Sequence, residues 1–259
     1  MKAARTALRQ QQASQQQATP RVAAVALEQI TKVYPGGVRA LDEVSLTVDP
    51  GTFVAVMGPS GSGKSTLMHC AAGLDTPTSG RAFIGGTESS GLSETRRTEL
   101  RRERVGVVFQ SYNLVPSLSV AENINLPLRL AGATPDRPWL RMLVERVGLA
   151  DQVTRRPTEL SGGQQQRAAI ARALVTKPAV VFGDEPTGAL DLRTARGVLD
   201  LLRDLVNDLG QTVVMVTHDP AAAARADLVL VMADGRVVDS LHTPTPAELA
   251  HRITTLEMG

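Results

Sequence analysis

The 259-residue chain is long enough for one large domain or two modest ones, because a domain has about 150 residues. Hydrophobic residues make up 42% and charged residues 21%, which is typical of a globular protein and excludes disorder along the whole chain. The longest uninterrupted apolar runs, 22–27 and 228–233, are much shorter than the ~20 residues of a membrane-spanning helix. The single cysteine, Cys70, cannot form an internal disulfide, which suits a reducing compartment.

Residues 1–21 carry four basic residues and no acidic one. Since the whole chain has a net charge of +2, the remaining residues have a net charge of −2, and the body of the protein is not a basic nucleic-acid binder. Residues 1–20 are rich in Gln and Ala and lack the long apolar core of a secretory signal. This composition predicts a flexible extension; a helix that touches acidic lipid headgroups or a partner is the alternative.

Strands that alternate with helices are predicted from residue 22 onward. Residues 44–48 alternate between apolar and polar, as in a half-buried strand. Continuous apolar runs indicate strands buried on both faces of a parallel sheet, at 53–57, 105–109, 179–182 and 212–217. Helical periodicity is clearest at 164–175 and 194–209, whereas 111–159 has helical spacing without a convincing strand. We therefore predict an α/β domain with a mainly parallel sheet and a helical insertion.

A glycine-rich loop directly follows the predicted strand 53–57 and fits the pattern G-x-x-x-x-G-K-[ST]. The glycines let successive backbone N–H groups point at phosphate oxygens, and the following helix adds the positive end of its dipole. Lys64 is expected to reach the β- and γ-phosphates of a nucleotide, and the Ser65 hydroxyl is expected to ligate Mg²⁺. The predicted phosphate loop comprises Gly58, Pro59, Ser60, Gly61, Ser62, Gly63, Lys64, Ser65 and Thr66.

Three other predicted strands also end in polar residues. Asp184 is placed to hold Mg²⁺ and Glu185 to polarise the attacking water, with a solvated acidic turn as the alternative. Gln110 is an amide able to ligate Mg²⁺ or orient water, and His218 follows the strand 212–217; taken alone, these are typical of a surface amide and a structural histidine. Because ligands of open α/β sheets bind beyond the carboxyl ends of the strands, four candidates at four such ends favour a shared site.

Residues 160–164, Leu-Ser-Gly-Gly-Gln, open the predicted helix 164–175. Ser161 and Gln164 have the spacing of a capping box, with Ser161 as the N-cap. A Gly-Gly N-terminus with bare N–H groups is also an anion site. Periodicity alone does not decide between a well-capped helix and a second anion site.

In their order along the chain, these motifs resemble an ABC-type ATPase over about residues 22–240. The resemblance implies a P-loop NTPase (RecA-like) core with a mainly parallel sheet, a small antiparallel β part near the N-terminus and a helical subdomain at about 111–165. Residues 241–259 are then expected to be a C-terminal tail. The motifs that carry the resemblance are the phosphate loop 58–66, Gln110, the signature 160–164 with Gln165-Gln166-Arg167, Asp184-Glu185, Ala189-Leu190-Asp191 and His218.

The same resemblance implies that the protein binds and hydrolyses ATP with Mg²⁺. Glu185 then activates water, while His218 and Gln110 sense the γ-phosphate. Two subunits pack head to tail, so that Ser161 and Gly163 of one contact the γ-phosphate held by Lys64 of the other. Other residues that the resemblance assigns to the nucleotide site are Tyr34, which stacks on adenine, Gly162, Gln164 and Asp191.

Longer matches are similar to the ATPases of macrolide exporters and lipoprotein-release systems, at 57–68, 108–110, 113–116, 184–191 and 215–219. They imply a peripheral homodimer on the cytoplasmic face of the inner membrane that powers a separate integral permease by mechanotransmission. Its cargo would be a hydrophobic, lipid-like or peptide substrate, and docking would involve the segment from Gln110 to Pro116 and the helical subdomain. A cell-division-type ATPase that regulates a peptidoglycan hydrolase without transport is the alternative. Gly183, where relatives often have Ala, and residues 1–20 depart from the pattern.

Overall fold

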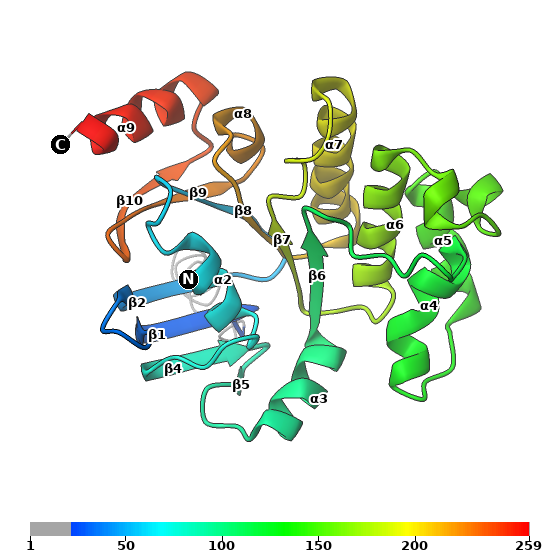
Figure 1. The fold of residues 1–259 in the computed structure, drawn as a ribbon, viewed down its shortest axis with the longest axis horizontal. Helices are drawn as coiled ribbons and strands as arrows, with labels where there is room; N and C mark the ends of the chain where they lie inside the picture. Colours follow the sequence, from blue (N-terminus) through cyan, green and yellow to red (C-terminus); the bar gives the residue numbers. More distant parts are fainter. Residues whose placement is uncertain (1–21, 259) are drawn as a thin grey trace, which may run out of the picture.

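Two β-sheets pack on either side of a short helix in the computed structural model, which describes residues 22–258 (Figure 1). The helix is α2 (Lys64–Ala71), which contacts strands of both sheets. The predicted extension 1–20 lies outside the described residues. The α/β class is confirmed, and the small antiparallel part near the N-terminus is present as a separate sheet.

The antiparallel sheet has the strand order β2-β1-β4-β5. Its strands are β1 (Val25–Val33), β2 (Arg39–Val48), β4 (Ser79–Ile84) and β5 (Thr87–Glu88). Strand β2 starts five residues before the predicted strand 44–48, because Glu43 has a left-handed φ of 52° and interrupts the alternation of side chains. The alternation that reveals this strand therefore exists only in its second half.

The larger sheet has the order β10-β9-β3-β8-β7-β6, and all neighbours except β10 and β9 are parallel. Its strands are β3 (Phe53–Met57), β6 (Val105–Phe109), β7 (Val180–Asp184), β8 (Val213–Val216), β9 (Leu228–Ala233) and β10 (Arg236–His242). Strand β3 shows why a continuous apolar run predicts a strand at the centre of this sheet. Phe53 and Met57 face the core formed with the helices, whereas Val54 and Val56 face the core beneath α2 and the antiparallel sheet.

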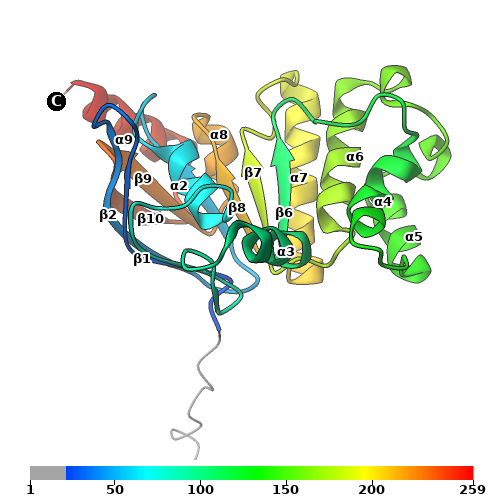
Figure 2. The ribbon, with the colours of Figure 1, turned by 60° about the horizontal axis from the view of Figure 1, so that its bottom comes forward.

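Helices flank the larger sheet and extend it on the side of β6 (Figures 1 and 2). They are α3 (Glu94–Arg104), α4 (Val120–Leu130), α5 (Arg137–Arg146), α6 (Gly162–Leu174), α7 (Leu192–Leu209) and α8 (Pro220–Ala223), with short 3₁₀ turns η1 (Ala150–Gln152) and η2 (Pro157–Glu159). Residues 111–159, all of which the structure describes, contain helices and no strand, as predicted. Within 22–258, none of the helices combines the length and the apolar character needed to cross a bilayer.

The C-terminal segment does not divide at residue 240, where the sequence analysis ended the ATPase domain. Strand β10 continues to His242, and helix α9 (Pro246–Met258) follows it and packs against α8. Leu249 of α9 is fully buried in the core that α6 and α7 share. Residues 241–258 are therefore packed on the domain rather than a tail separate from it.

Candidate functional site

The register of the parallel strands brings the predicted polar residues to one edge of the sheet. Val216 of β8 lies opposite both Val56 of β3 and Asp184 of β7. Asp184 is also paired with Phe109 at the end of β6. The chain leaves these four strands at the phosphate loop, Gln110, Glu185 and Thr217, so their loops lie side by side.

The phosphate loop is shaped by close backbone contacts. A Cβ on Gly63, whose φ is +98°, would lie 2.3 Å from the carbonyl oxygen of Ala40. A Cβ on Gly58 would lie 2.2 Å from the carbonyl oxygen of Met232. Lys64 Nζ folds back and donates to the carbonyl oxygens of Gly58 and Pro59 at 2.8 and 2.7 Å. Glycine is therefore required at both positions, and the lysine ammonium lies inside the loop.

A cavity of about 320 Å³ opens over the loop. Glu185 and Val216 line it together with the loop, which brings a carboxylate into the space that the loop surrounds. The residues that line the cavity are Ala40, Ser60, Gly61, Gly63, Lys64, Ser65, Thr66, Glu185 and Val216. Burial lowers the pKa of Lys64, while the negative charge of Glu185 opposes this shift. The cavity is thus lined both by a cation that can bind phosphate, Lys64, and by a carboxylate, Glu185.

Glu185 accepts hydrogen bonds from three donors in the loop after β8. Its Oε1 accepts from the His218 backbone amide at 3.0 Å and lies 2.7 Å from His218 Nδ1, and its Oε2 accepts from the Thr217 hydroxyl at 3.3 Å. With Nδ1 as the donor in this contact, Nε2 of the exposed ring is left for another partner. The backbone of Glu185 has a left-handed φ of 48°, a strained conformation that is common at functional sites.

Thr217 and Gln166 contribute to the site although the sequence analysis assigned no role to either. Thr217 bonds to Glu185, and the adjacent His218 was the only signal that pointed to this loop. Gln166 of α6 is fully buried, and its Nε2 donates to the carbonyl oxygen of Pro186. It therefore ties the signature helix to the turn after Glu185. Gln166 lies four residues before the buried Ile170 on the same face of α6, and this spacing is the pattern that could have revealed it.

Asp184 is the second carboxylate at this edge, and burial raises its pKa. Its carboxylate and the Ser65 hydroxyl are hard oxygen donors of the kind that Mg²⁺ takes in small number, alongside phosphate oxygens and water. The described residues contain no cluster of three carboxylate, histidine or cysteine side chains able to hold a metal alone. This donor set fits a magnesium ion that is held together with a nucleotide.

Asp184→Asn is expected to raise the melting temperature of the nucleotide-free protein by about 1–3 °C at pH 7. Because the folded pKa is raised, the ionised carboxylate costs stability above that pKa, and the cost is absent once both folded and unfolded states are protonated. Thermal unfolding of the two proteins should therefore converge as the pH falls below the unfolded-state pKa of about 4. A lower melting temperature for the variant at pH 7 would show that the carboxylate stabilises the fold instead.

Gln110 lies against the loop that follows Glu185. A Cβ on Gly188 would lie 2.7 Å from Gln110 Nε2, so glycine leaves room for this amide. The segment after Gln110 is held by Arg172 of α6. This arginine donates to the carbonyl oxygens of Tyr112 and Asn113, and burial lowers its pKa.

The signature residues 161–164 form the capping box predicted for them. Ser161 is the N-cap of α6, its Oγ accepts from the Gln164 amide at 3.3 Å, and Gln164 Oε1 accepts from the Ser161 amide at 2.9 Å. The amides of Gly162 and Gly163 have no partner within the helix. In both views α6 lies beyond β6 and β7 as seen from α2 (Figures 1 and 2). The phosphate loop and the signature are thus separated within one chain.

Asp191 and Tyr34 are placed outside the lining of the cavity. Asp191 is the N-cap of α7, and its carboxylate accepts hydrogen bonds from the Arg193 and Thr194 amides and the Thr194 hydroxyl. Tyr34 begins the connection between β1 and β2, and Ala40, the second residue of β2, does line the cavity.

Comparison with known proteins gives a consistent result. A profile of the ABC transporter family matches residues 41–188. The macrolide export ATP-binding/permease protein MacB of Burkholderia pseudomallei (strain 1710b) is 46% identical over 223 residues, which cover 84% of this chain and 34% of MacB. The chain therefore spans about a third of the length of MacB. The lipoprotein-releasing system ATP-binding protein LolD of Bordetella avium (strain 197N) is 46% identical over 221 residues, which cover 83% of this chain and 96% of LolD.

A solved structure resembles most of the fold. It is the dimeric, post-hydrolysis state of the ATP-binding cassette MJ0796 bound to ADP and Pi. The two structures superpose with a TM-score of 0.76 at 38% sequence identity, covering 85% of this chain and 99% of the MJ0796 chain.

Proposed function

Because the chain belongs to the ABC transporter family and is an ATPase of that family, we propose that it hydrolyses Mg-ATP between two head-to-tail subunits and thereby drives a membrane permease. One observation carries the hydrolytic part: a single cavity is lined by the phosphate loop and by Glu185. A triphosphate bound in the loop would have its γ-phosphate next to the Glu185 carboxylate, within the same cavity. Phosphoryl transfer needs mainly such positioning and charge neutralisation.

The polar residues in and beside the cavity are then assigned separate tasks. Lys64 leaves the carbonyl oxygens of Gly58 and Pro59 and binds the β- and γ-phosphates. Glu185 polarises the attacking water, and His218 moves its hydrogen bond from Glu185 to the γ-phosphate. Mg²⁺, when bound, would be held by Ser65 and Asp184, with Gln110 as a further ligand, and would neutralise phosphate charge.

The position of the signature supports the proposed dimeric arrangement. Its free amides form an anion site at a helix N-terminus, but α6 and α2 lie on different sides of β6 and β7 (Figure 2). Another subunit's nucleotide is therefore the fitting ligand for Ser161, Gly163 and their neighbours, and Asp191 lies near the same surface at the start of α7. The dimeric state of MJ0796, to which this fold is similar, supports the proposal.

The permease is proposed to dock on the segment from Gln110 to Pro116 and on the adjoining helical subdomain. Asn123 of α4 fixes one end of this segment, with its Oδ1 accepting from the Val115 amide at 2.7 Å and its Nδ2 donating to the Val115 carbonyl oxygen at 3.1 Å. Arg172 fixes the middle. The side chains of Asn113 and Pro116 are exposed. A rigid, exposed edge directly after Gln110 is suited to transmit a change at the γ-phosphate to a partner.

The names of the relatives guide the proposed cargo and location. MacB is named for macrolide export and LolD for lipoprotein release, so we assign this chain to export or extraction of a hydrophobic, lipid-like or peptide substrate. We further propose that ATP hydrolysis is coupled to the permease by mechanotransmission. The protein would then lie on the cytoplasmic face of the inner membrane.

A membrane pull-down with Glu185→Gln protein tests the transport assignment. With ATP present, the trapped dimer should hold its partner longest, and mass spectrometry should identify a permease with a large extracytoplasmic domain. The same protein without nucleotide is the control and should capture less. Capture of a small four-helix partner together with cell-wall hydrolases would contradict the assignment and favour the cell-division function.

A further inference from the structure

Tyr34 is held by a partner that neither the phosphate loop nor the signature supplies. Its hydroxyl donates to Asp75 Oδ2 at 3.1 Å, across 41 positions of the sequence. Lys32 Nζ donates to Asp75 Oδ1 at 2.6 Å and lies 5.0 Å from the centroid of the Tyr34 ring. The three side chains thus form a bracket, the Lys32–Tyr34–Asp75 bracket, in which the lysine covers one face of the ring.

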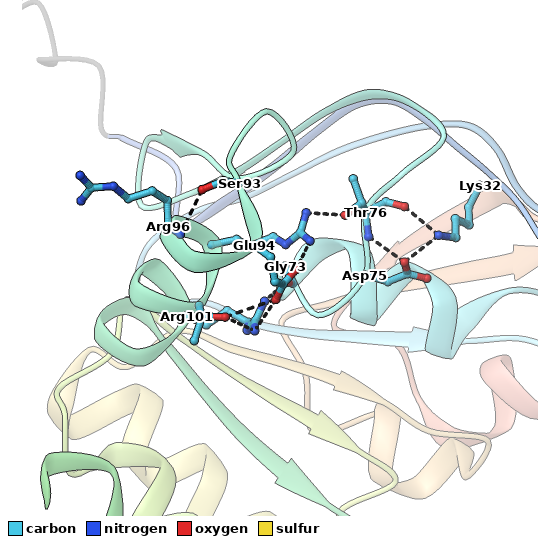
Figure 3. A network of polar contacts seen from close by, with 10 residues as sticks. Lys32, Gly73, Asp75, Thr76, Ser93, Glu94, Arg96 and Arg101 are labelled. Carbon is cyan, nitrogen blue, oxygen red and sulfur yellow. Dashed lines mark hydrogen bonds and ion pairs between the residues drawn. The ribbon is translucent and has the colours of Figure 1, made fainter. Parts of the chain in front are cut away.

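Asp75 is itself fixed from several directions. It follows α2, its own amide donates to the carbonyl oxygen of His69 at 3.1 Å, and its Oδ1 accepts from the Thr76 amide at 2.7 Å. Lys32 also donates to the Thr76 carbonyl oxygen at 2.8 Å (Figure 3). Burial alone would raise the pKa of Asp75, but hydrogen bonds from Lys32, Thr76 and Tyr34 hold it below its ordinary value. The carboxylate is therefore ionised at neutral pH and keeps its orientation.

The backbone after Tyr34 forms a tight turn, in which the Tyr34 amide donates to the Val38 carbonyl oxygen at 2.9 Å and the Gly37 amide donates to the Tyr34 carbonyl oxygen at 3.1 Å. Gly36 and Gly37 follow Tyr34 with φ of +91° and +82°, and neither would bring a Cβ within 4 Å of another atom. Ala40, the second residue of β2, lines the phosphate cavity. The ring at the start of the connection and this wall of the cavity are thus six positions apart in the sequence.

We propose that Asp75 is a positioning residue for the nucleotide base: through the Lys32–Tyr34–Asp75 bracket it holds the Tyr34 ring with one face covered by Lys32 and the opposite face presented to adenine. The inference rests on the proposed ATPase function and on the family resemblance, which makes Tyr34 the aromatic residue that stacks on adenine. It adds that the affinity for the base depends on an ion pair after α2. A preorganised ring binds more tightly because less rotational freedom is lost on stacking.

Calorimetric titration of the full chain with ATP and with inorganic tripolyphosphate separates base from phosphate binding. Tyr34→Phe keeps the ring and removes only the hydroxyl, and it is expected to raise the Kd for ATP about 3- to 10-fold. Asp75→Ala should do the same, and the double variant should not exceed the larger single effect, because both changes break one interaction. The Kd for tripolyphosphate should stay within about twofold in all three variants, since tripolyphosphate lacks a base.

A second lysine–aromatic–aspartate group offers a matched control. Lys177 Nζ lies 5.2 Å from the Trp139 ring centroid and pairs with Asp136 at 2.8 Å, outside the lining of the phosphate cavity. Asp136→Ala should leave both dissociation constants unchanged. An unchanged Kd for ATP in Tyr34→Phe and Asp75→Ala, with a raised Kd in Tyr34→Ala, overturns the positioning role and leaves the proposed function standing. Equal weakening of tripolyphosphate and ATP overturns it as well, whereas a wild-type chain that binds no ATP refutes the proposed function itself.

Discussion

Glu185→Gln is expected to bind ATP at least as tightly as the wild-type protein and to hydrolyse it about 10²–10⁴-fold more slowly. Glutamine has nearly the same shape but cannot take a proton from water. Binding should survive because Lys64 and the loop amides, which carry the affinity for phosphate, are unchanged. The loss of a negative charge from the cavity that the γ-phosphate enters also removes a repulsion. Steady-state phosphate release and titration with ATP at low temperature measure the two quantities.

Glu248→Gln is the matched control for this variant. Glu248 also accepts from a backbone amide and a hydroxyl, both of Thr245 at 2.7 Å, but it lies at the start of α9. Its conversion to glutamine should leave the rate of ATP hydrolysis unchanged. That result would show that losing a hydrogen-bonded carboxylate elsewhere in the protein does not stop hydrolysis. Near-normal turnover by Glu185→Gln would remove Glu185 from the mechanism.

The strands that the sequence predicted best are continuous apolar runs. The runs 53–57 and 105–109 match β3 and β6 at both ends. Strand β3 is buried throughout, as expected of a central strand, whereas β6 lies at the edge of the sheet and alternates between buried and partly buried residues. Strands β1, β4 and β10 were not predicted, since each is exposed on alternate or irregular positions and register shifts break the pattern. Helix α9 was missed for another reason: Leu249 is its only fully buried residue among those described, so the sequence shows little of its packing.

The site was predictable where a motif carries its own chemistry and not where two distant segments meet. The pattern at 58–66 fixes the phosphate loop, and a strand end fixes the position of Glu185. The bond from Thr217 to Glu185 and that from Tyr34 to Asp75 join residues 32 and 41 positions apart. Neither residue type nor spacing indicates these pairs, because they depend on which strands become neighbours in the sheet.

Ser161→Arg is expected to prevent ATP-driven dimerisation and to lower ATP hydrolysis by about 10²-fold or more. Ser161 is exposed at the N-terminus of α6, where the proposed dimer places the γ-phosphate of the other subunit. Arginine adds a long side chain to that contact and removes the N-cap. The phosphate cavity of the same chain is lined by other residues, so the Kd of the monomer for ATP should change less than about threefold. Size-exclusion chromatography of Glu185→Gln with and without Ser161→Arg, in ATP, measures dimer formation.

Ser119→Arg controls for the damage to a cap. Ser119 and Glu122 form the same capping box at the start of α4, with bonds of 3.2 and 2.8 Å, outside the proposed nucleotide contact. This variant should dimerise and hydrolyse ATP normally. If Ser161→Arg also kept its hydrolysis, the head-to-tail arrangement would be wrong.

A mixture of Ser161→Arg and Lys64→Ala subunits distinguishes contact between subunits from contact within one. Each protein alone should be inactive, since every site in its homodimer has one damaged half. In the mixed dimer, Lys64 of the first subunit meets Ser161 of the second, so one site is intact. The other site pairs the Lys64→Ala loop with the Ser161→Arg signature. Because this loop binds triphosphate weakly, the site can stay empty and accommodate the arginine side chain. Mixing should therefore restore part of the hydrolysis, whereas a site formed within one chain would stay inactive at every mixing ratio.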